Sequence, residues 1–271
     1  MTDTLASDNH DKVSDAALEV RNLSKSFGGI AAVNQVSFTV PRGEFYGIIG
    51  PNGSGTSTLV DCISGMLRMD SGSVILEGAD ISRLPLHRIA SLGLLRTFQV
   101  SRLFEEISVL SNVMVAAPDQ DGQGLWRASF GRWRAKQAES LEVARDLLKF
   151  YELTKHEDEL ASTLSGGQRR LLELARLSIR RPKVILLDEP FAGVSPVYRT
   201  RIVELLRSLV SNGVTIVMVE HRLDLVEQLC DHIIVMAEGS IIGQGLLSDL
   251  RRDQTIIDAY LGEVHDHTPR M

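Results

Sequence analysis

Short apolar runs alternate with helical segments through the second half of this 271-residue chain, and this alternation limits the possible folds more than any other feature. Two of the runs are VILLD at 184–188 and VTIVMVE at 214–220. Strands that alternate with helices form a parallel sheet covered on both faces, so we predict an α/β fold. We expect helices at about 167–180, 196–210 and 222–230, and strands at 184–188, 214–220, 232–236 and 240–243.

The first half of the chain has two further patterns. Short strand-like runs come first, and a mostly helical segment at about 100–163 follows them, which we interpret as an inserted helical subdomain. The expected strands lie at 17–27, 31–40, 43–50, 73–78 and 94–98, with a helix at 57–67. We therefore expect one domain at 17–263 between disordered tails at 1–16 and 264–271.

Composition and charge exclude several classes of protein. Lys and Arg number 29 against 35 Asp and Glu, a net charge of −6, so we expect no nucleic-acid partner. The longest strongly apolar stretches, such as 214–219, fall far short of the roughly 20 residues that span a bilayer. The first sixteen residues lack the basic region and apolar core of a secretion signal, which favours a cytosolic location.

A glycine-rich segment, GPNGSGTST at 50–58, stands between an expected strand and an expected helix. Its glycines permit tight turns and close backbone approach, so that successive N–H groups converge on phosphate oxygens at a helix N-terminus. These glycines are Gly50, Gly53 and Gly55. Ser57 stands where a hydroxyl would ligate Mg²⁺. The segment therefore predicts a phosphate-binding loop.

One fixed position of this motif is changed. Against G-x-x-x-x-G-K-[ST], every position is present except the lysine, which is Thr56. No other Lys or Arg lies between Arg42 and Arg68 to replace it locally. We therefore expect weaker nucleotide binding at this site. We also expect position 56 to lie at the edge of the loop, where a substitution changes the stability of the fold little.

The second half supplies further candidate site residues. Asp188 and Glu189 follow a buried strand, as a magnesium-side carboxylate and a general base for water would. LSGGQRR at 164–170 opens a helix with an amide-lined anion site. His221 ends the next strand, at the same carboxyl edge, although a lone His there is commonly a surface residue. The side-chain amide of Gln99 could reach metal or water.

Five motifs in this order resemble the ATP-binding subunits of ABC transporters. They are GPNGSGTST, the glutamine of RTFQ, LSGGQ, LLDEP and the histidine of VEH. The resemblance covers about residues 17–263 and implies a P-loop fold with a mostly parallel core sheet, an antiparallel β subdomain and the inserted helical subdomain. It also implies a head-to-tail dimer with two ATP molecules between the chains.

The resemblance assigns roles to particular residues. It implies that Phe27 stacks on adenine, that Glu189 polarises the attacking water, and that His221 contacts the γ-phosphate. Mg²⁺ and its waters would be organised by Ser57, Gln99 and Asp188. The ATP phosphates would be bound by Gly50, Pro51, Asn52, Gly53, Ser54, Gly55, Thr56, Ser57 and Thr58. The ATP held by the partner chain would be bound by Ser165, Gly166, Gly167 and Gln168.

Other strings narrow the resemblance to the ATPases of branched-chain amino-acid importers. They are RTFQ with LFEEISVLSNVMVA, VEHRLDLVEQLCD and IIDAYLGE. This resemblance implies membrane permease subunits, a second ATP-binding subunit and, indirectly, a solute-binding protein as partners, at the cytoplasmic face of the membrane. EPFAGVSP and LPLH also resemble the lipopolysaccharide-export ATPase, so urea, a lipid or lipopolysaccharide stays open as cargo. A nucleotide-binding regulatory subunit without useful hydrolysis at its own loop is the alternative from another class.

Overall fold

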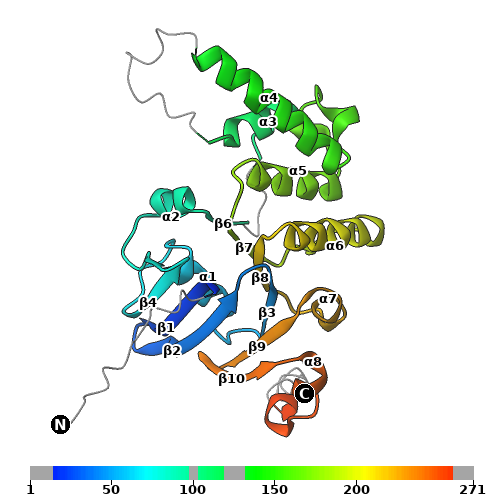
Figure 1. Ribbon diagram of the computed structural model, residues 1–271. Coiled ribbons are helices and arrows are strands. Elements are labelled where there is room, and N and C mark those ends of the chain that lie inside the picture. The colour runs from blue at the N-terminus through cyan, green and yellow to red at the C-terminus, as the bar shows by residue number, and fades with distance from the viewer. Residues whose placement is uncertain (1–14, 98–102, 119–131, 259–271) are drawn as a thin grey trace, which may run out of the picture.

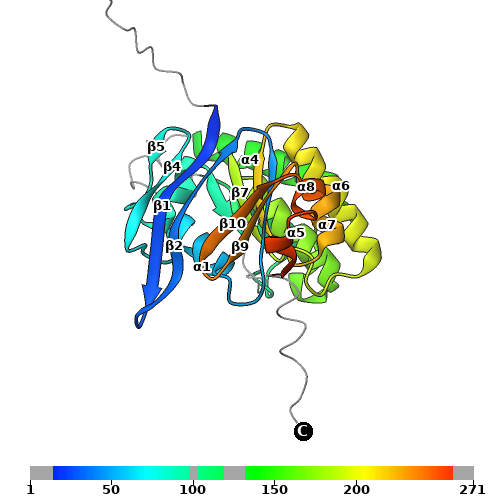
Figure 2. The ribbon, with the colours of Figure 1, turned by 90° about the horizontal axis from the view of Figure 1, so that it is seen from below.

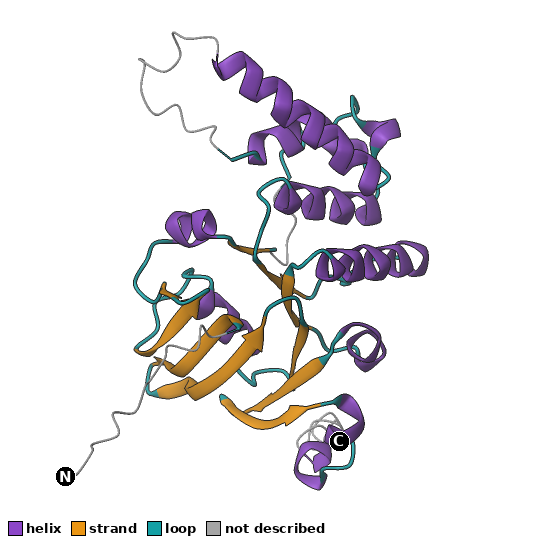
Figure 3. Cartoon of the chain, in the orientation of Figure 1, coloured by secondary structure: helices purple, strands orange, loops and turns teal. Residues whose placement is uncertain are grey.

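Two sheets and a layer of helices make up the part of the chain that the computed structural model describes, residues 15–97, 103–118 and 132–258, with the side chains of 132–135 left out. Figure 1 shows the two sheets below and the helices α3, α4 and α5 above them. Figure 3 shows the same division by colour, with the strands gathered in the lower part. Among the described residues, no helix is both long and apolar enough to cross a membrane.

The larger sheet has six strands and is mostly parallel, as the sequence predicts. Its order is β10 (Ser240–Gly245), β9 (His232–Ala237), β3 (Phe45–Ile49), β8 (Thr215–Val219), β7 (Val184–Asp188) and β6 (Leu94–Arg96). Only the β10–β9 pair is antiparallel. Every residue of β3, β7 and β8 is buried, which explains why these strands are continuous apolar runs.

The smaller sheet is antiparallel. Its order is β2 (Ile30–Pro41), β1 (Ala16–Phe27), β4 (Ser71–Leu76) and β5 (Ala79–Asp80). Helix α1 (Thr56–Ile63) packs between the sheets, because Leu59 and Val60 belong to a core cluster that includes Leu18 of β1 and Ile48 of β3. The position of α1 at this junction fixes the glycine-rich loop, the predicted phosphate-binding loop, which directly precedes it.

Helices cover the other face of the larger sheet. Figures 1 and 2 both show α6 (Pro196–Ser211) and α7 (Leu223–Leu229) on the side opposite α1 and the smaller sheet. The short α8 (Leu247–Leu250) follows β10. The fold is therefore the predicted α/β fold, with the parallel sheet enclosed between two layers.

The helical segment between β6 and β7 forms the layer at the top of Figure 1. It contains α3 (Val109–Ala116), α4 (Arg132–Phe150), the 3₁₀ turns Thr154–His156 and Ala161–Thr163, and α5 (Gly166–Ser178). Helix α5 packs against both α3 and α4, so this layer continues beyond Thr163.

Several element boundaries differ from the expectation, and one helix was not predicted. Helix α1 ends at Ile63 rather than at 67, because Gly65 has a φ of +75°. The described part of β6 stops at Arg96, and the predicted residue 98 lies outside the described residues. Helix α2 (Leu86–Leu92) was not predicted, since only Ile89 in it is buried and the segment lacks a wide apolar stripe.

Candidate functional site

The glycine-rich loop joins β3 to α1 in a conformation that requires its glycines. Gly53 and Gly55 have φ values of +80° and +95°. A Cβ on Gly50 would lie 2.5 Å from Ser54 Oγ, and one on Gly55 would collide with the carbonyl oxygen of Ala32. A Cβ on Gly53 would meet nothing within 4 Å, so the space over this part of the loop is open. The loop thus packs closely against the rest of the protein on one side and is open on the other, as expected for a phosphate-binding loop.

The start of α1 is suited to an anion. Gly55 is the N-cap and provides no side-chain hydrogen bond to the first turn of the helix, so the N–H groups of that turn remain for a ligand. Ser57 is exposed, while Pro51 and Thr58 are half-buried and Asn52 is exposed. Within the described ranges, the buried Ser54 Oγ has no hydrogen-bond partner. An unsatisfied hydroxyl in the loop supports a polar ligand there.

Thr56 lies in a different environment from the one that the sequence suggested. We expected this position at the edge of the loop, where a substitution would hardly affect stability. In the structure Thr56 is the first residue of α1 and only 6% exposed. The expected position at the edge of the loop was therefore wrong, because Thr56 begins α1 and is buried.

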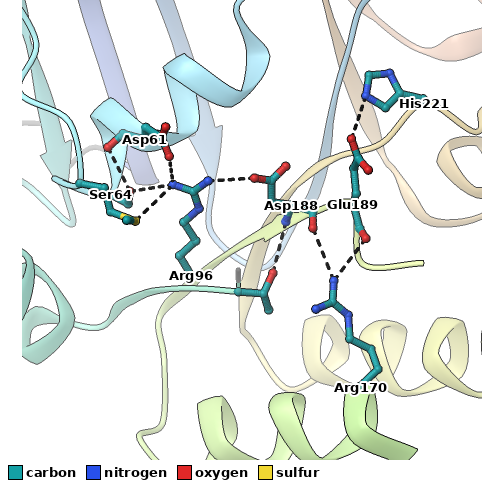
Figure 4. Close-up of polar contacts among 9 residues, drawn as sticks. Asp61, Ser64, Arg96, Arg170, Asp188, Glu189 and His221 are labelled. Carbon is teal, nitrogen blue, oxygen red and sulfur yellow. Dashed lines mark hydrogen bonds and ion pairs between the residues drawn. The ribbon is translucent and has the colours of Figure 1, made fainter. Parts of the chain in front are cut away.

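Glu189 and His221 lie in contact at the carboxyl edge of the larger sheet. His221 Nε2 is 3.2 Å from Glu189 Oε1 (Figure 4). They come from adjacent parallel strands, because Glu189 follows β7 and donates its backbone N–H to Val219 of β8. Glu189 has a φ of +43°, a conformation uncommon for a residue with a side chain. The structure thus brings together the expected base and the expected histidine.

Asp188 ends β7 and is held by an arginine that the sequence analysis did not single out. Arg96 Nη2 donates to Asp188 Oδ2 at 2.8 Å, and Arg96 Nη1 pairs with Asp61 of α1 (Figure 4). The sequence contains one indication of this role of Arg96: it stands next to Thr97 in RTFQ, at the end of an expected strand. Asp188 and Ser57 offer the oxygen ligands that Mg²⁺ prefers, so the residues present fit this ion.

Two more residues of this edge were missed. Arg170 of α5 donates to the carbonyl oxygens of Pro190 at 2.9 Å and Glu189 at 3.3 Å, so it ties the helical layer to the chain after β7. Glu220 directly follows β8 and is only 4% exposed. Burial, and then the charge of Glu189, raises the pKa of Glu220 to about 7.

The LSGGQ motif begins α5 with a capping box. Ser165 Oγ accepts from the N–H of Gln168 at 3.4 Å, and Gln168 Oε1 accepts from the N–H of Ser165 at 2.9 Å. Ser165 and Gly166 are exposed, whereas Gly167 is buried and a Cβ there would collide with the ring of Tyr198. Figure 1 shows α5 in the helical layer and α1 between the sheets, so the two anion-binding motifs lie in different layers.

The remaining predicted residues are Phe27 and Gln99. Phe27 ends β1 with 50% of its surface exposed, and Lys25 Nζ lies 5.4 Å from its ring centroid. An exposed aromatic ring offers a face for stacking a base. Gln99 lies outside the described residues.

Known proteins resemble this chain over most of its length. A family model described as "ABC transporter" matches residues 33–192. The probable branched-chain amino acid transport ATP-binding protein LivG of Archaeoglobus fulgidus is 41% identical over 90% of this chain and 95% of that protein. The high-affinity branched-chain amino acid transport ATP-binding protein BraF of Pseudomonas aeruginosa is 36% identical, over 91% and 98%. A solved ATP-binding cassette of an ABC transporter in its ADP conformation has a TM-score of 0.79 and 35% identity, covering 91% of this chain and 99% of that chain.

Proposed function

The chain belongs to the ABC transporter family of ATPases, and from this premise we propose that it is the energy-coupling subunit of an importer for branched-chain or related amino acids. We infer the cargo from the relatives. Two proteins that are 36–41% identical to this chain over about nine-tenths of its length are named as branched-chain amino acid transport ATP-binding proteins. Urea, a lipid or lipopolysaccharide is the alternative cargo.

The placement of the two phosphate-binding motifs carries this proposal. The loop at 50–58, the Glu189–His221 pair and Asp188 adjoin one edge of the larger sheet, while the exposed Ser165 end of α5 lies in the helical layer. Two copies arranged head to tail would bring the Ser165 end of each chain to the loop of the other. Each ATP would then be bound by residues of both chains, and the dimer would close on ATP.

In this arrangement each residue has a specific task. The loop amides bind phosphate oxygens, and Phe27 stacks on the base. Glu189 accepts a proton from the attacking water, while His221, in contact with Glu189, orients that carboxylate and faces the terminal phosphate. Bound Mg²⁺ would neutralise part of the phosphate charge. Its ligands would be Ser57, Asp188 and, as predicted from the sequence, Gln99.

Thr56 supports a second candidate function. An ammonium about 4 Å from a phosphate charge is worth up to about 4 kcal/mol at an effective dielectric near 20, and this chain lacks that ammonium. Losing half of that energy weakens binding by more than about tenfold. The alternative is therefore a subunit that binds nucleotide and serves the partner's site through its LSGGQ motif without useful hydrolysis at its own loop.

The segment before α3 supports a membrane permease as partner. Phe104 is 50% exposed, and Leu103 beside it is half-buried. An exposed aromatic residue next to the helical layer suits the cytoplasmic helices of a permease. The proposed location is accordingly the cytoplasmic face of the membrane, reached through this contact.

Steady-state ATPase measurements on the purified chain, alone and with permease subunits encoded by neighbouring genes, test the proposal. Energy coupling predicts ATP hydrolysis that the permease stimulates, together with ATP-dependent uptake of leucine into vesicles. Nucleotide binding without hydrolysis, in both preparations, would favour the regulatory subunit. Uptake of a different cargo would keep the coupling role and overturn the substrate assignment.

A further inference from the structure

Arg96 is a buried cation at the end of β6 that touches both sides of the nucleotide site. Its side chain is 8% exposed, and that of Asp188 is 9% exposed. Nη2 donates to Asp188 Oδ2 at 2.8 Å, while Nη1 pairs with Asp61 and lies 3.4 Å from Ser64 Oγ. One guanidinium thus joins the end of β7 to the helix that follows the phosphate-binding loop (Figure 4).

The contacts leave one carboxylate oxygen for the metal. Among the described residues, the contacts of the Asp188 carboxylate involve Oδ2 alone, so Oδ1 remains available. The backbone around it is also fixed by the residue that follows β6, since the Asp188 N–H lies 3.3 Å from Thr97 Oγ1 and the Thr97 N–H donates to the carbonyl oxygen of Leu186. The direction of Oδ1 is therefore set by Arg96 at the end of β6 and by Thr97 after it.

Helix α1 provides the other fixed point. Asp61 lies one helical turn after Ser57, so both side chains lie on the same face of α1. A guanidinium that holds Asp61 and Asp188 together fixes the separation between the carboxylate and the Ser57 hydroxyl. A lysine offers a single point charge and is poorly matched to two carboxylates at once.

We propose that Arg96 is a positioning residue for the nucleotide site, which clamps Asp188 to α1 so that Oδ1 and the Ser57 hydroxyl are correctly placed for Mg²⁺. This inference rests on the proposed function, because it requires that Mg²⁺ accompanies the nucleotide. In a chain with Thr56 in place of lysine, more of the nucleotide affinity depends on the ion, so the clamp has a larger effect.

The test is the ratio of ADP dissociation constants without and with Mg²⁺, measured by isothermal titration. We expect Arg96→Met to lower this ratio at least fivefold, Arg96→Lys to lower it less, and Asp61→Asn to have the smallest effect of the three. A role confined to folding would weaken binding equally with and without Mg²⁺ and leave the ratio unchanged. The matched control is Arg180→Met, because Arg180 lines the same pocket as Arg96 without contacting Asp188.

Thermal unfolding of each variant shows whether it is folded before titration. Should Arg96→Met fail to fold, Arg96→Lys keeps the charge and decides the question alone. If the wild-type ratio is above one and both Arg96→Lys and Arg96→Met keep the same ratio, the inference is overturned. The proposed function is unaffected by that result. A wild-type chain whose ADP affinity does not depend on Mg²⁺ at all overturns the role of the ion itself, and with it this inference.

Discussion

Thr56 is the residue with the largest expected effect on nucleotide affinity. It occupies the lysine position of the loop, and the helix N-terminus, the glycines and Ser57 are otherwise in place. Only a point charge directed at the β- and γ-phosphates is missing. The effect of this residue is therefore electrostatic and can be tested by restoring the charge.

Thr56→Lys should tighten binding of MgATP at least about tenfold, since half of the Coulomb energy of the ammonium corresponds to that factor. Because position 56 is buried, the nucleotide-free variant should unfold at a lower temperature, and saturating MgATP should raise its unfolding temperature more than that of wild type. Isothermal titration, phosphate release and thermal unfolding of both proteins measure these effects. Equal affinity and equal turnover would show that Thr56 is compatible with a competent site.

Glu189→Gln should abolish most of the remaining hydrolysis and leave nucleotide binding unchanged. The amide keeps the shape of the side chain and its contact with His221, but it cannot accept the proton of the attacking water. Phosphate release under single-turnover conditions, combined with a binding titration, separates the two effects. Glu227→Gln, at an exposed carboxylate paired with Arg251, is the control. Hydrolysis at the wild-type rate in Glu189→Gln would contradict the role of Glu189 as the base.

Glu220 should make the stability of the fold depend on pH. Its pKa in the folded chain is about 7, raised from 4.5 by burial and by Glu189 and partly offset by His221 and Arg222. The folded chain then holds a proton that the unfolded chain releases, so the stabilisation is complete below pH 4.5 and is lost as the pH rises through 7. Glu220→Gln should therefore unfold at a higher temperature than wild type at pH 8, with a smaller difference at pH 5. A difference independent of pH would contradict this assignment.

At the scale of elements, the segment that leads into α3 is locally rigid. The side chain of Asn112 accepts from the N–H of Phe104 and donates to its carbonyl oxygen, both at 2.9 Å. The exposed ring of Phe104 is packed on Arg176 of α5, with the guanidinium carbon 5.2 Å from the ring centroid. The backbone clamp does not depend on the ring of Phe104, so replacement of this exposed residue should spare the fold, whereas Leu103 packs against the core and its replacement should also lower stability.

Charge substitutions at Leu103 and Phe104 should accordingly prevent binding of the permease. An aspartate at either position adds a charge to a surface that we expect an apolar helix to cover. Pull-down and cross-linking with the permease measure the binding, and nucleotide titration shows that the site is unaffected. Val197→Asp, at an 80% exposed position of α6, is the control. Unchanged permease binding by both aspartate variants would place the docking surface elsewhere.

At the scale of the whole molecule, the site is divided between two layers of one chain. The loop at 50–58 directly precedes α1, between the sheets, and the start of α5 lies in the helical layer, so in the proposed head-to-tail arrangement each site is completed by a second chain. The proposed partner is a copy of this chain or a related one. A chain that has an intact LSGGQ motif and a loop without the lysine suits a pair of chains in which one of the two proposed sites is the more active.

Ser165→Asp should prevent ATP-dependent dimerisation and leave the monomer stable. Aspartate is also a good N-cap, so α5 keeps its cap, while the added negative charge faces the phosphates of the partner's ATP. Light scattering with and without ATP, in the Glu189→Gln background, measures the dimer. An ATP-dependent dimer in the Ser165→Asp variant would contradict the composite site.

Local sequence patterns determined most of the elements and nearly all of the motifs. The strand at 184–188 was predicted with the bounds that it has, because a buried parallel strand is a continuous apolar run. The same logic predicted Glu189 and His221 at one edge of the sheet, where parallel strands end, and the structure shows that they are in contact. Short motifs with fixed spacing can be recognised in a sequence, because the residues that act together lie close together in the chain.

Only the tertiary structure decided which residues from distant segments of the chain are in contact and how deeply they are buried. The Arg96 guanidinium joins residues 35 and 92 positions away, and no periodicity encodes such a contact. The burial of Thr56 and the raised pKa of Glu220 likewise depend on what the rest of the chain packs against them. Hydrophobic burial acts between surfaces and is indifferent to separation in sequence, so the environment of each charge is a property of the assembled fold.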